Sequence, residues 1–381
     1  MFAFLKIFDK TGQVPDKKLL FAIMSLVIFG WIMSSSASIG HFGIYNKAFM
    51  QLGFIVVGIV AGIFTLKTPL SFYKENRYWL ILLTLILLIV VITPLGKTIN
   101  GSTRWIPLGG FNLQPSEILK LVIILFTAGF LVEQEEDLRH PWLGFIKALF
   151  IIAIPSVLLI IEPDYGATII VVATILIMLL VAGVYLKQLI ATGGILSLLI
   201  IGIISTNQNR VDRFTAFWRE DLWLNHSDKV WQTKQALIGI ARGDWTGVGL
   251  GNGIQKYTKL PEPHTDMIFA IIGEETGIIG MGFVLLTFTY IILRGFKIAR
   301  EALKDDRRYS SYVGFGICTW LSMQFSVNIS MNLGLIPPKG FTLPLVSYGG
   351  SSMILILVSM AILLRIDLEN RTESSKRRYY V

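Results

Sequence analysis

Ionisable side chains gather just before one long apolar segment. The stretch 260–266 ends in His264-Thr265-Asp266, contains Glu262, and is followed at once by an apolar run. Asp266 is therefore expected at the boundary between water and lipid, beside His264 and Glu262. A simpler role stays open, in which Thr265 or Asp266 only caps the helix that follows.

Two adjacent carboxylates, Glu274 and Glu275, fall inside that apolar run. In a straight helix that rises 1.5 Å per residue they would lie about 12 Å deeper than Asp266. Because a charge in lipid is costly, at least one of them should face a polar cavity or a basic partner. Neither these carboxylates nor His264 have the spacing of a zinc site, and cysteine ligands are absent.

A second candidate pair opens another apolar segment. Pro115 is a helix-start signal, and Glu117 and Lys120 follow it three residues apart. This spacing places them on one helix face, where they can form an ion pair. The pair either faces the interior of a helix bundle, which would mark a functional site, or reaches toward the membrane interface.

Further polar residues lie in short loops on the same side of the chain. Arg104 belongs to the loop 96–114, and Asp164 lies in a turn between two apolar segments. Pro163 and Gly166 mark that turn, so Asp164 could also be an ordinary solvated turn residue. In the last such loop, Lys339 is a candidate contact for an anion. Small polar residues that follow it, Ser347 among them, are tolerable at membrane depth only where they line protein or a cavity.

The segment 206–266 is too long to be a simple connector. Its arginines and aromatic residues between 210 and 219 suit an amphipathic element at the level of the lipid headgroups, although they could also bind phosphate or sugar rings. Its glycine-rich stretch 247–253 matches neither the glycine spacing of a dinucleotide-binding motif nor that of a P-loop. A tight re-entrant turn is the better interpretation.

These residues are positioned by a chain whose main solvent is lipid. Hydrophobic residues make up 53% of the sequence and charged residues 15%, whereas a soluble domain carries about 25% charged residues. The sequence predicts an all-α integral membrane protein of about ten transmembrane helices. The expected spans are 19–38, 48–66, 79–95, 115–132, 144–162, 167–184, 188–205, 267–293, 311–333 and 351–366.

Lysine and arginine set the expected orientation. With the N-terminus inside, 21 of the 34 lie on the cytoplasmic side, and the short outer loops hold only 4. The net charge of +9 is thus mostly a matter of topology, which argues against nucleic acid as a partner. We expect one polytopic domain over 1–381. It would have a cytoplasmic N-terminus (1–18), a large extracytoplasmic loop between spans 7 and 8 (206–266) and a basic cytoplasmic tail (367–381).

Before any family is considered, these features add up to a site on the outer leaflet. It would combine cations, one well-placed carboxylate and a groove in the membrane. That chemistry suits an amphipathic lipid with a phosphorylated headgroup.

The motifs together resemble the SEDS family (shape, elongation, division, sporulation) over about residues 20–368. Within that family the chain is more similar to the cell-division members than to the elongation members. Small departures, such as Pro263, Met267 and Thr276, remove no charged group. The residues that carry the resemblance are Arg104-Trp105, Gln114-Pro115-Ser116-Glu117 with Lys120, Glu162-Pro163-Asp164-Tyr165-Gly166, Leu260-Pro261-Glu262 with His264-Thr265-Asp266, and Pro344-Leu345 with Ser347-Tyr348-Gly349-Gly350-Ser351.

The resemblance implies a peptidoglycan glycosyltransferase that polymerises lipid II. It implies a class B penicillin-binding transpeptidase and other divisome membrane proteins as partners. The implied location is the bacterial cytoplasmic membrane at the division septum. Asp266 matches the essential aspartate of the family, and Arg104, Glu117 and Lys120 match other polar residues of its central cavity.

As a hypothesis, Asp266 would deprotonate or position the acceptor hydroxyl. Arg104, Lys120 and Lys339 would neutralise the leaving pyrophosphate. Asp164, Glu262, His264, Thr265 and Ser347 are the further candidates for substrate contact. A divalent cation, Mg²⁺ or Mn²⁺, with Asp266 as its candidate ligand, stays open, and no organic cofactor is expected.

Three other functions compete with this one. A lipid II flippase would use the same groove to move the lipid between leaflets, although the key groups gather at the outer face. A non-catalytic division scaffold would use the long loop for docking but leaves Asp266 unexplained. An elongation-type polymerase of the same family is the third alternative.

Overall fold

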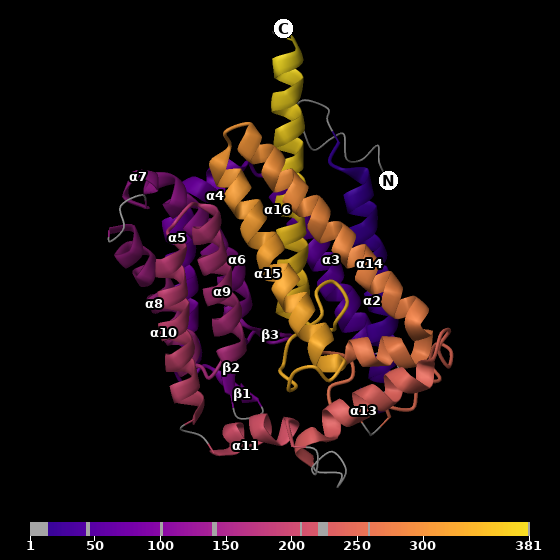
Figure 1. Ribbon diagram of the computed structural model, residues 1–381. Helices are drawn as coiled ribbons and strands as arrows, with labels where there is room; N and C mark the ends of the chain where they lie inside the picture. Colours follow the sequence, from indigo (N-terminus) through magenta and orange to yellow (C-terminus); the bar gives the residue numbers. More distant parts are fainter. Residues whose placement is uncertain are drawn as a thin grey trace.

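The computed structural model describes residues 14–42, 46–99, 102–138, 143–205, 208–219, 228–257 and 260–379. Helices dominate these residues (Figure 1). They are α2 (Lys17–Phe42), α3 (Asn46–Lys67), α4 (Leu70–Glu75), α5 (Arg77–Ile92), α6 (Pro115–Glu133), α7 (Glu135–Leu138), α8 (Leu143–Ile161), α9 (Tyr165–Val181), α10 (Leu186–Ser205), α11 (Gln208–Phe217), α13 (Asp228–Gly243), α14 (Ile268–Lys304), α15 (Arg308–Asn332) and α16 (Gly350–Tyr379).

Each of the ten predicted apolar segments falls on one of these helices, which confirms the helical membrane fold. By length and composition, α2, α3, α6, α14 and α16 are able to cross a membrane, and α5, α8, α9 and α10 contain shorter apolar stretches. The number of spans and the side of the membrane on which each loop lies stay predictions.

The predicted all-α membrane fold is confirmed, and the structure adds one small element that the sequence did not predict. The stretch predicted as a plain loop over 96–114 forms a small antiparallel sheet of β1 (Lys97–Ile99), β2 (Ser102–Pro107) and β3 (Asn112–Leu113). In Figure 1 this sheet lies near the same end of the bundle as α11 and α13, whereas α2 starts and α16 ends at the opposite end. The pairing of three short strands fixes the position of β2, which carries Arg104.

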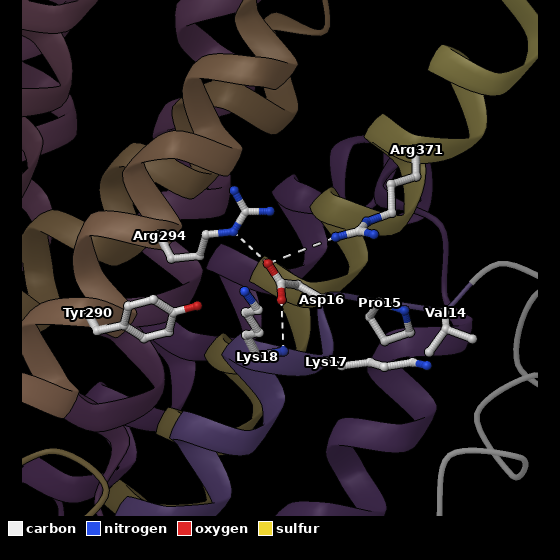
Figure 2. A pocket seen from close by; sticks show the side chains of 8 residues that line it. All are labelled: Val14, Pro15, Asp16, Lys17, Lys18, Tyr290, Arg294 and Arg371. Carbon is white, nitrogen blue, oxygen red and sulfur yellow. Dashed lines mark hydrogen bonds and ion pairs between the residues drawn. The ribbon is translucent and has the colours of Figure 1, made fainter. Parts of the chain in front are cut away.

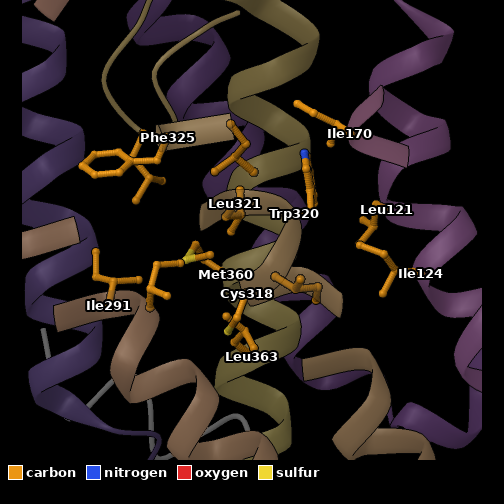
Figure 3. Close-up of a cluster of buried hydrophobic side chains, with 14 of the residues drawn as sticks. Leu121, Ile124, Ile170, Ile291, Cys318, Trp320, Leu321, Phe325, Met360 and Leu363 are labelled. Carbon is orange, nitrogen blue, oxygen red and sulfur yellow. The ribbon is translucent and has the colours of Figure 1, made fainter. Parts of the chain in front are cut away.

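Buried side chains of α6, α9, α14, α15 and α16 form the core (Figure 3). Lipid is as apolar as these side chains, so helices associate mainly through close packing, and small residues at the contacts help. A Cβ at Gly314 would lie 2.8 Å from Cβ of Ala299, so glycine is what lets α15 approach α14 this closely. Cys318 is buried in this core, as expected for a small packing residue.

Helix α14 is not one straight helix. Gly277 has φ 65° and ψ −162°, so the helical hydrogen-bonding pattern breaks there. Figure 1 shows the chain changing direction between the short first part of α14 and the long part that follows. The break lies beyond Glu274 and Glu275, which stay in the first helical part, so their depth relative to Asp266 stays a prediction.

The predicted need of these two carboxylates for partners is confirmed. Lys256 Nζ lies 2.6 Å from Glu275 Oε1, and both groups are fully buried. Ser36 of α2 donates to the same carboxylate at 2.7 Å. Arg242 of α13 pairs with Glu274 at 2.9 Å.

The glycine-rich stretch folds around the same carboxylates. The backbone N–H groups of Gly251 and Ile254 donate to Glu275 and Glu274 at 3.1 and 2.9 Å. Gly247 has φ 79°, and a Cβ there would clash with the backbone of Glu275. The predicted turn is thus present, and its glycines allow close approach to α14 instead of binding a nucleotide.

This network generates a stability prediction. Lys256→Met should destabilise the protein by about 3–5 kcal/mol, because it leaves the buried carboxylate of Glu275 without its cation. The double variant Lys256→Met/Glu275→Gln should regain a large part of that loss. Thermal unfolding of the purified chain in one detergent measures both effects.

Lys187→Met on exposed α10 is the matched control and should change stability by less than about 0.5 kcal/mol. If Lys256→Met proved no more damaging than this control, the buried ion pair would not be what holds α14 against the glycine-rich stretch.

Candidate active-site cavity

A cavity of about 900 Å³ collects side chains from segments that are far apart in the sequence. Its polar wall comes from β2, the first turns of α6 and α9, the stretch before α14 and the stretch before α16. Arg104, Glu117, Lys120, Asp164, Glu262, Thr265 and Asp266 all line it. Seven of the ten predicted site residues therefore meet in one place.

The backbone at Asp266 is held by two buried asparagines of α15. Its carbonyl oxygen accepts hydrogen bonds from Asn328 Nδ2 at 3.0 Å and Asn332 Nδ2 at 2.9 Å. Asn332 also accepts from the N–H of Ala270 at 3.0 Å, which satisfies one donor in the first turn of α14. The N-cap of α14 is Met267, and it makes no side-chain cap bond. The capping role considered for Thr265 and Asp266 is therefore wrong, and the carboxylate faces the cavity.

The carboxyl group of Asp266 has an unusual acidity. Burial is the largest cause that raises its pKa, to about 7, and the negative charge of Glu262 adds to the effect. Hydrogen bonds from backbone N–H groups and from the Thr265 hydroxyl, at 3.1 Å, act in the opposite direction. A carboxylate with a pKa near neutrality can accept a proton efficiently at physiological pH.

Glu117 and Lys120 form the predicted pair, with Lys120 Nζ 2.7 Å from Glu117 Oε1. Both side chains are largely buried, and Lys120 also donates to Oε1 of Gln324 at 3.1 Å and lies over the Trp320 ring. The pair therefore faces the interior of the bundle, and the alternative of an interfacial pair is wrong. Gln324 could not be selected from the sequence, since an amide in a long apolar segment belongs to no motif.

Arg104 and Asp164 meet at another part of the wall, with 3.5 Å between their charged atoms. Asp164 accepts from the Ser116 hydroxyl at 3.0 Å and from the N–H of Ala167 at 3.3 Å, so it caps α9. Arg104 also donates to the carbonyl oxygen of Pro163. Asp164 is buried, so the alternative of a solvated turn residue is wrong.

Ser347 and His264 lie buried behind the cavity wall. Ser347 Oγ donates to the carbonyl oxygen of Thr265 at 2.5 Å and accepts from Leu343 N at 2.7 Å. The N–H of Tyr348 donates to the carbonyl oxygen of His264 at 2.9 Å. These bonds fasten the stretch before α16 to the stretch before α14. In this structure the two residues support the wall, and direct contact with a substrate stays a prediction for them.

Lys339 is exposed and lies next to Gly340 and Phe341, which line the cavity. Its contact with an anion also stays a prediction. Lys47 and Lys97 line the cavity but were not selected from the sequence. Their positions in short outer loops, which are otherwise poor in basic residues, were the signal that could have identified them.

Among the residues that the structure describes, no three His, Cys, Asp or Glu side chains come together as metal ligands. Asp266 and Glu262 are two carboxylates of the cavity lining that interact electrostatically. Glu262 has φ 48°, a strained conformation for this residue, and about half of its side chain is exposed.

Glu162 is a buried carboxyl group beside this wall. Burial, followed by the charge of Asp164, raises its pKa to about 8, and Arg104 acts in the opposite direction. Neither of its oxygens has a hydrogen-bond partner among the described residues. We therefore expect Glu162 to be protonated at neutral pH.

This leads to a prediction about pH. A carboxyl whose folded pKa is raised binds a proton that the unfolded chain lacks, so folding stability falls as pH rises from about 4.5 to about 8. Glu162→Gln should remove this contribution, at most about 5 kcal/mol across that window, since one pKa unit corresponds to about 1.4 kcal/mol. Thermal unfolding in detergent at pH 5 and pH 8.5 should show a smaller loss for the variant than for the wild type. An equal loss in both proteins would mean that Glu162 is not buried as an acid.

Comparisons with known proteins agree with this geometry. The family described as "Cell cycle protein", which groups FtsW, RodA and SpoVE, matches residues 17–372. A protein of Marinobacter nauticus named probable peptidoglycan glycosyltransferase FtsW is 38% identical over 362 residues, covering 94% of this chain and 90% of that protein. One of the same name from Legionella pneumophila is 38% identical over 368 residues, covering 94% and 92%.

Solved structures share the fold. A chain of a peptidoglycan synthase complex has a TM-score of 0.77 at 23% identity, covering 93% of this chain and 98% of that chain. The rod shape determining protein RodA of Thermus thermophilus has a TM-score of 0.69 at 22% identity, covering 93% and 97%. A match over nearly the whole chain, with relatives at 38% identity, leads to one conclusion: the chain belongs to the FtsW, RodA and SpoVE family of cell-cycle proteins, the SEDS family.

Proposed function

We propose that this chain is a peptidoglycan glycosyltransferase that polymerises lipid II into β-1,4-linked glycan strands during cell division. The names of its relatives support this function. The single structural observation that carries it is the position of Asp266. Its carboxylate lines a cavity with four basic side chains and has a pKa near 7.

The reaction follows from that position. The 4-hydroxyl oxygen of the acceptor sugar attacks the anomeric carbon of the donor, and Asp266 takes the hydroxyl proton. The bond from that carbon to the pyrophosphate oxygen breaks, and undecaprenyl pyrophosphate leaves with the electron pair. Donor α-linkage and product β-linkage require one inversion, which a single displacement provides.

The opposite charges of the cavity lining limit how well the protein alone can neutralise a leaving pyrophosphate. The lining contains Lys47, Lys97, Arg104 and Lys120, and also Glu117, Asp164, Glu262 and Asp266. Four basic groups face four acidic ones, so a pyrophosphate meets little net positive charge. Arg104 and Lys120 are held in place by their acidic partners. They can therefore contact a leaving group with little further loss of side-chain conformational entropy.

A divalent cation would supply the missing charge. Mg²⁺ is usually held by one or two carboxylates together with substrate phosphates, and the adjacent carboxylates of Asp266 and Glu262 fit that pattern. When bound, the ion would neutralise the leaving pyrophosphate. The repulsion between these two carboxylates is the observation that favours this proposal.

The partner and the location belong to the same proposal. A class B penicillin-binding transpeptidase would crosslink the strands as they form, at the septum of a dividing bacterium. The similar fold within a peptidoglycan synthase complex supports such a pairing. A flippase or a scaffold is not favoured, since the relatives are named as glycosyltransferases.

Substitution of the base tests this function directly. Asp266→Asn should reduce the rate of lipid II polymerisation by about 10² to 10⁴-fold, because the amide cannot accept the proton. The assay is glycan strand formation by the purified chain together with its transpeptidase. Asp244→Asn is the matched control, since Asp244 is exposed and lies outside the cavity. Its φ of 47° is a conformation that asparagine adopts as readily as aspartate. An Asp266→Asn protein that keeps half of the wild-type rate would remove Asp266 from the mechanism.

The pH profile provides a second test. Asp266 is the base only when ionised, so the rate should rise with pH through about 7. Glu262 raises the pKa of Asp266 by its negative charge, so Glu262→Gln should move this limb to lower pH. The dependence of kcat on pH, measured for both proteins, detects the shift. If kcat rose over the same pH range in both proteins, a group other than Asp266 would control the pH dependence.

A further inference from the structure

At the opposite end of the bundle, ion pairs join the start of α2 to α14 and α16 (Figure 2). Arg294 Nε of α14 donates to Asp16 Oδ2 at 2.5 Å, and the N–H of Asp16 donates to Asp367 Oδ2 at 2.8 Å. Arg371 Nε donates to the same Asp367 oxygen at 2.7 Å. These bonds fix the first turn of α2, and with it Lys17 and Lys18.

A basic pocket of about 490 Å³ opens beside these ion pairs. Lys17, Lys18, Arg294 and Arg371 line it, together with Asp16 as the acidic side chain among the described residues of its lining. Tyr290 completes one side (Figure 2). Arg294 and Arg371 are paired with Asp16 and Asp367, so they mainly set the shape of the pocket, and Lys17 and Lys18 add the positive charge that favours an anion.

An apolar groove of about 680 Å³ continues from this pocket along α2 and α14. Lys17, Lys18 and Tyr290 line both spaces, so the two are continuous. On α2 the groove follows Lys18, Phe21, Ala22 and Ser25, and on α14 it follows Tyr290, Thr287, Leu286 and Phe283. Each set repeats at three or four residues and so forms one stripe on its helix. Along both stripes the lining changes from apolar to basic toward the same end.

The walls and the floor of the groove are apolar. Phe21 and Leu286 are 72% and 74% exposed, so they flank an open space instead of filling it. Phe29 packs edge-on against Phe283 with 5.2 Å between ring centroids, which holds the two helices together. Tyr290 places a polar hydroxyl where the apolar part meets the basic part, as aromatic residues do at membrane interfaces.

We propose that this groove binds one anionic glycerophospholipid, with its phosphate in the basic pocket and an acyl chain between α2 and α14. Basic pockets between membrane helices on the cytoplasmic side are suited to anionic headgroups. The positive-inside distribution of lysine and arginine assigns this end to that side. A soluble phosphate would leave the apolar part unused, and a zwitterionic lipid lacks the net negative charge that Lys17 and Lys18 select. The proposal does not depend on the reaction in the outer cavity.

The test uses the full chain purified in a neutral detergent and titrated with phosphatidylglycerol, with native mass spectrometry to count bound lipid. Lys17→Gln/Lys18→Gln removes two charges of the pocket and should weaken binding about 30-fold. Ser25→Phe fills the groove without changing any charge and should weaken binding at least about tenfold. Lys297→Gln/Lys304→Gln, exposed on α14 outside both spaces, is the matched control and should stay within about twofold of the wild type.

Each outcome decides the proposal. The proposal is supported if the lysine variant of the pocket and the Ser25→Phe variant of the groove bind phosphatidylglycerol more weakly while the control binds it normally. All variants must unfold within a few degrees of the wild type. Wild-type binding in both variants would overturn it. Loss in the lysine variant alone, with competition by soluble glycerol phosphate, would reduce the site to an anion site and also overturn it. Equal affinity for phosphatidylcholine would show that the basic pocket does not select the lipid.

Discussion

Charges inside this protein need partners from the protein itself, because a bundle in lipid offers little water to solvate them. That constraint joins segments that are far apart in the sequence. Lys256 and Ser36 meet at Glu275, and Arg242 meets Glu274. Through these contacts α13 and the glycine-rich stretch are held against the first part of α14.

The same constraint shapes the cavity. Lys120 and Arg104 have acidic partners, so they are held in the wall while their charges are largely compensated. Asp266 differs, because among the described residues the Thr265 hydroxyl is the side-chain donor to its carboxylate, and asparagines anchor its backbone. Burial without a cation partner is what raises its pKa toward 7. A compensated wall around one uncompensated carboxylate is an arrangement suited to proton transfer next to a phosphorylated lipid.

Helix α14 connects the two ends of the molecule. Its break at Gly277 lets the first part follow the cavity wall while the long part runs along the bundle. At the far end, Arg294 of the same helix joins Asp16 and borders the basic pocket. A lipid bound in that pocket would contact the helix that begins two residues after Asp266. Lipid composition would then affect the helix on which the outer site depends.

Local chemistry in the sequence determined much of this protein. Long apolar runs have to become helices in lipid, and three-residue spacing on a helix forces Glu117 and Lys120 together. Motifs around Asp266 and Asp164 identified most of the cavity wall. Only the tertiary structure decided which distant groups meet: Lys256 with Glu275, Gln324 with Lys120, and Ser347 behind the wall instead of on it. Those contacts depend on how helices pack across the chain, and the break at Gly277 depends on the segment packed against it. Local periodicity cannot encode either one.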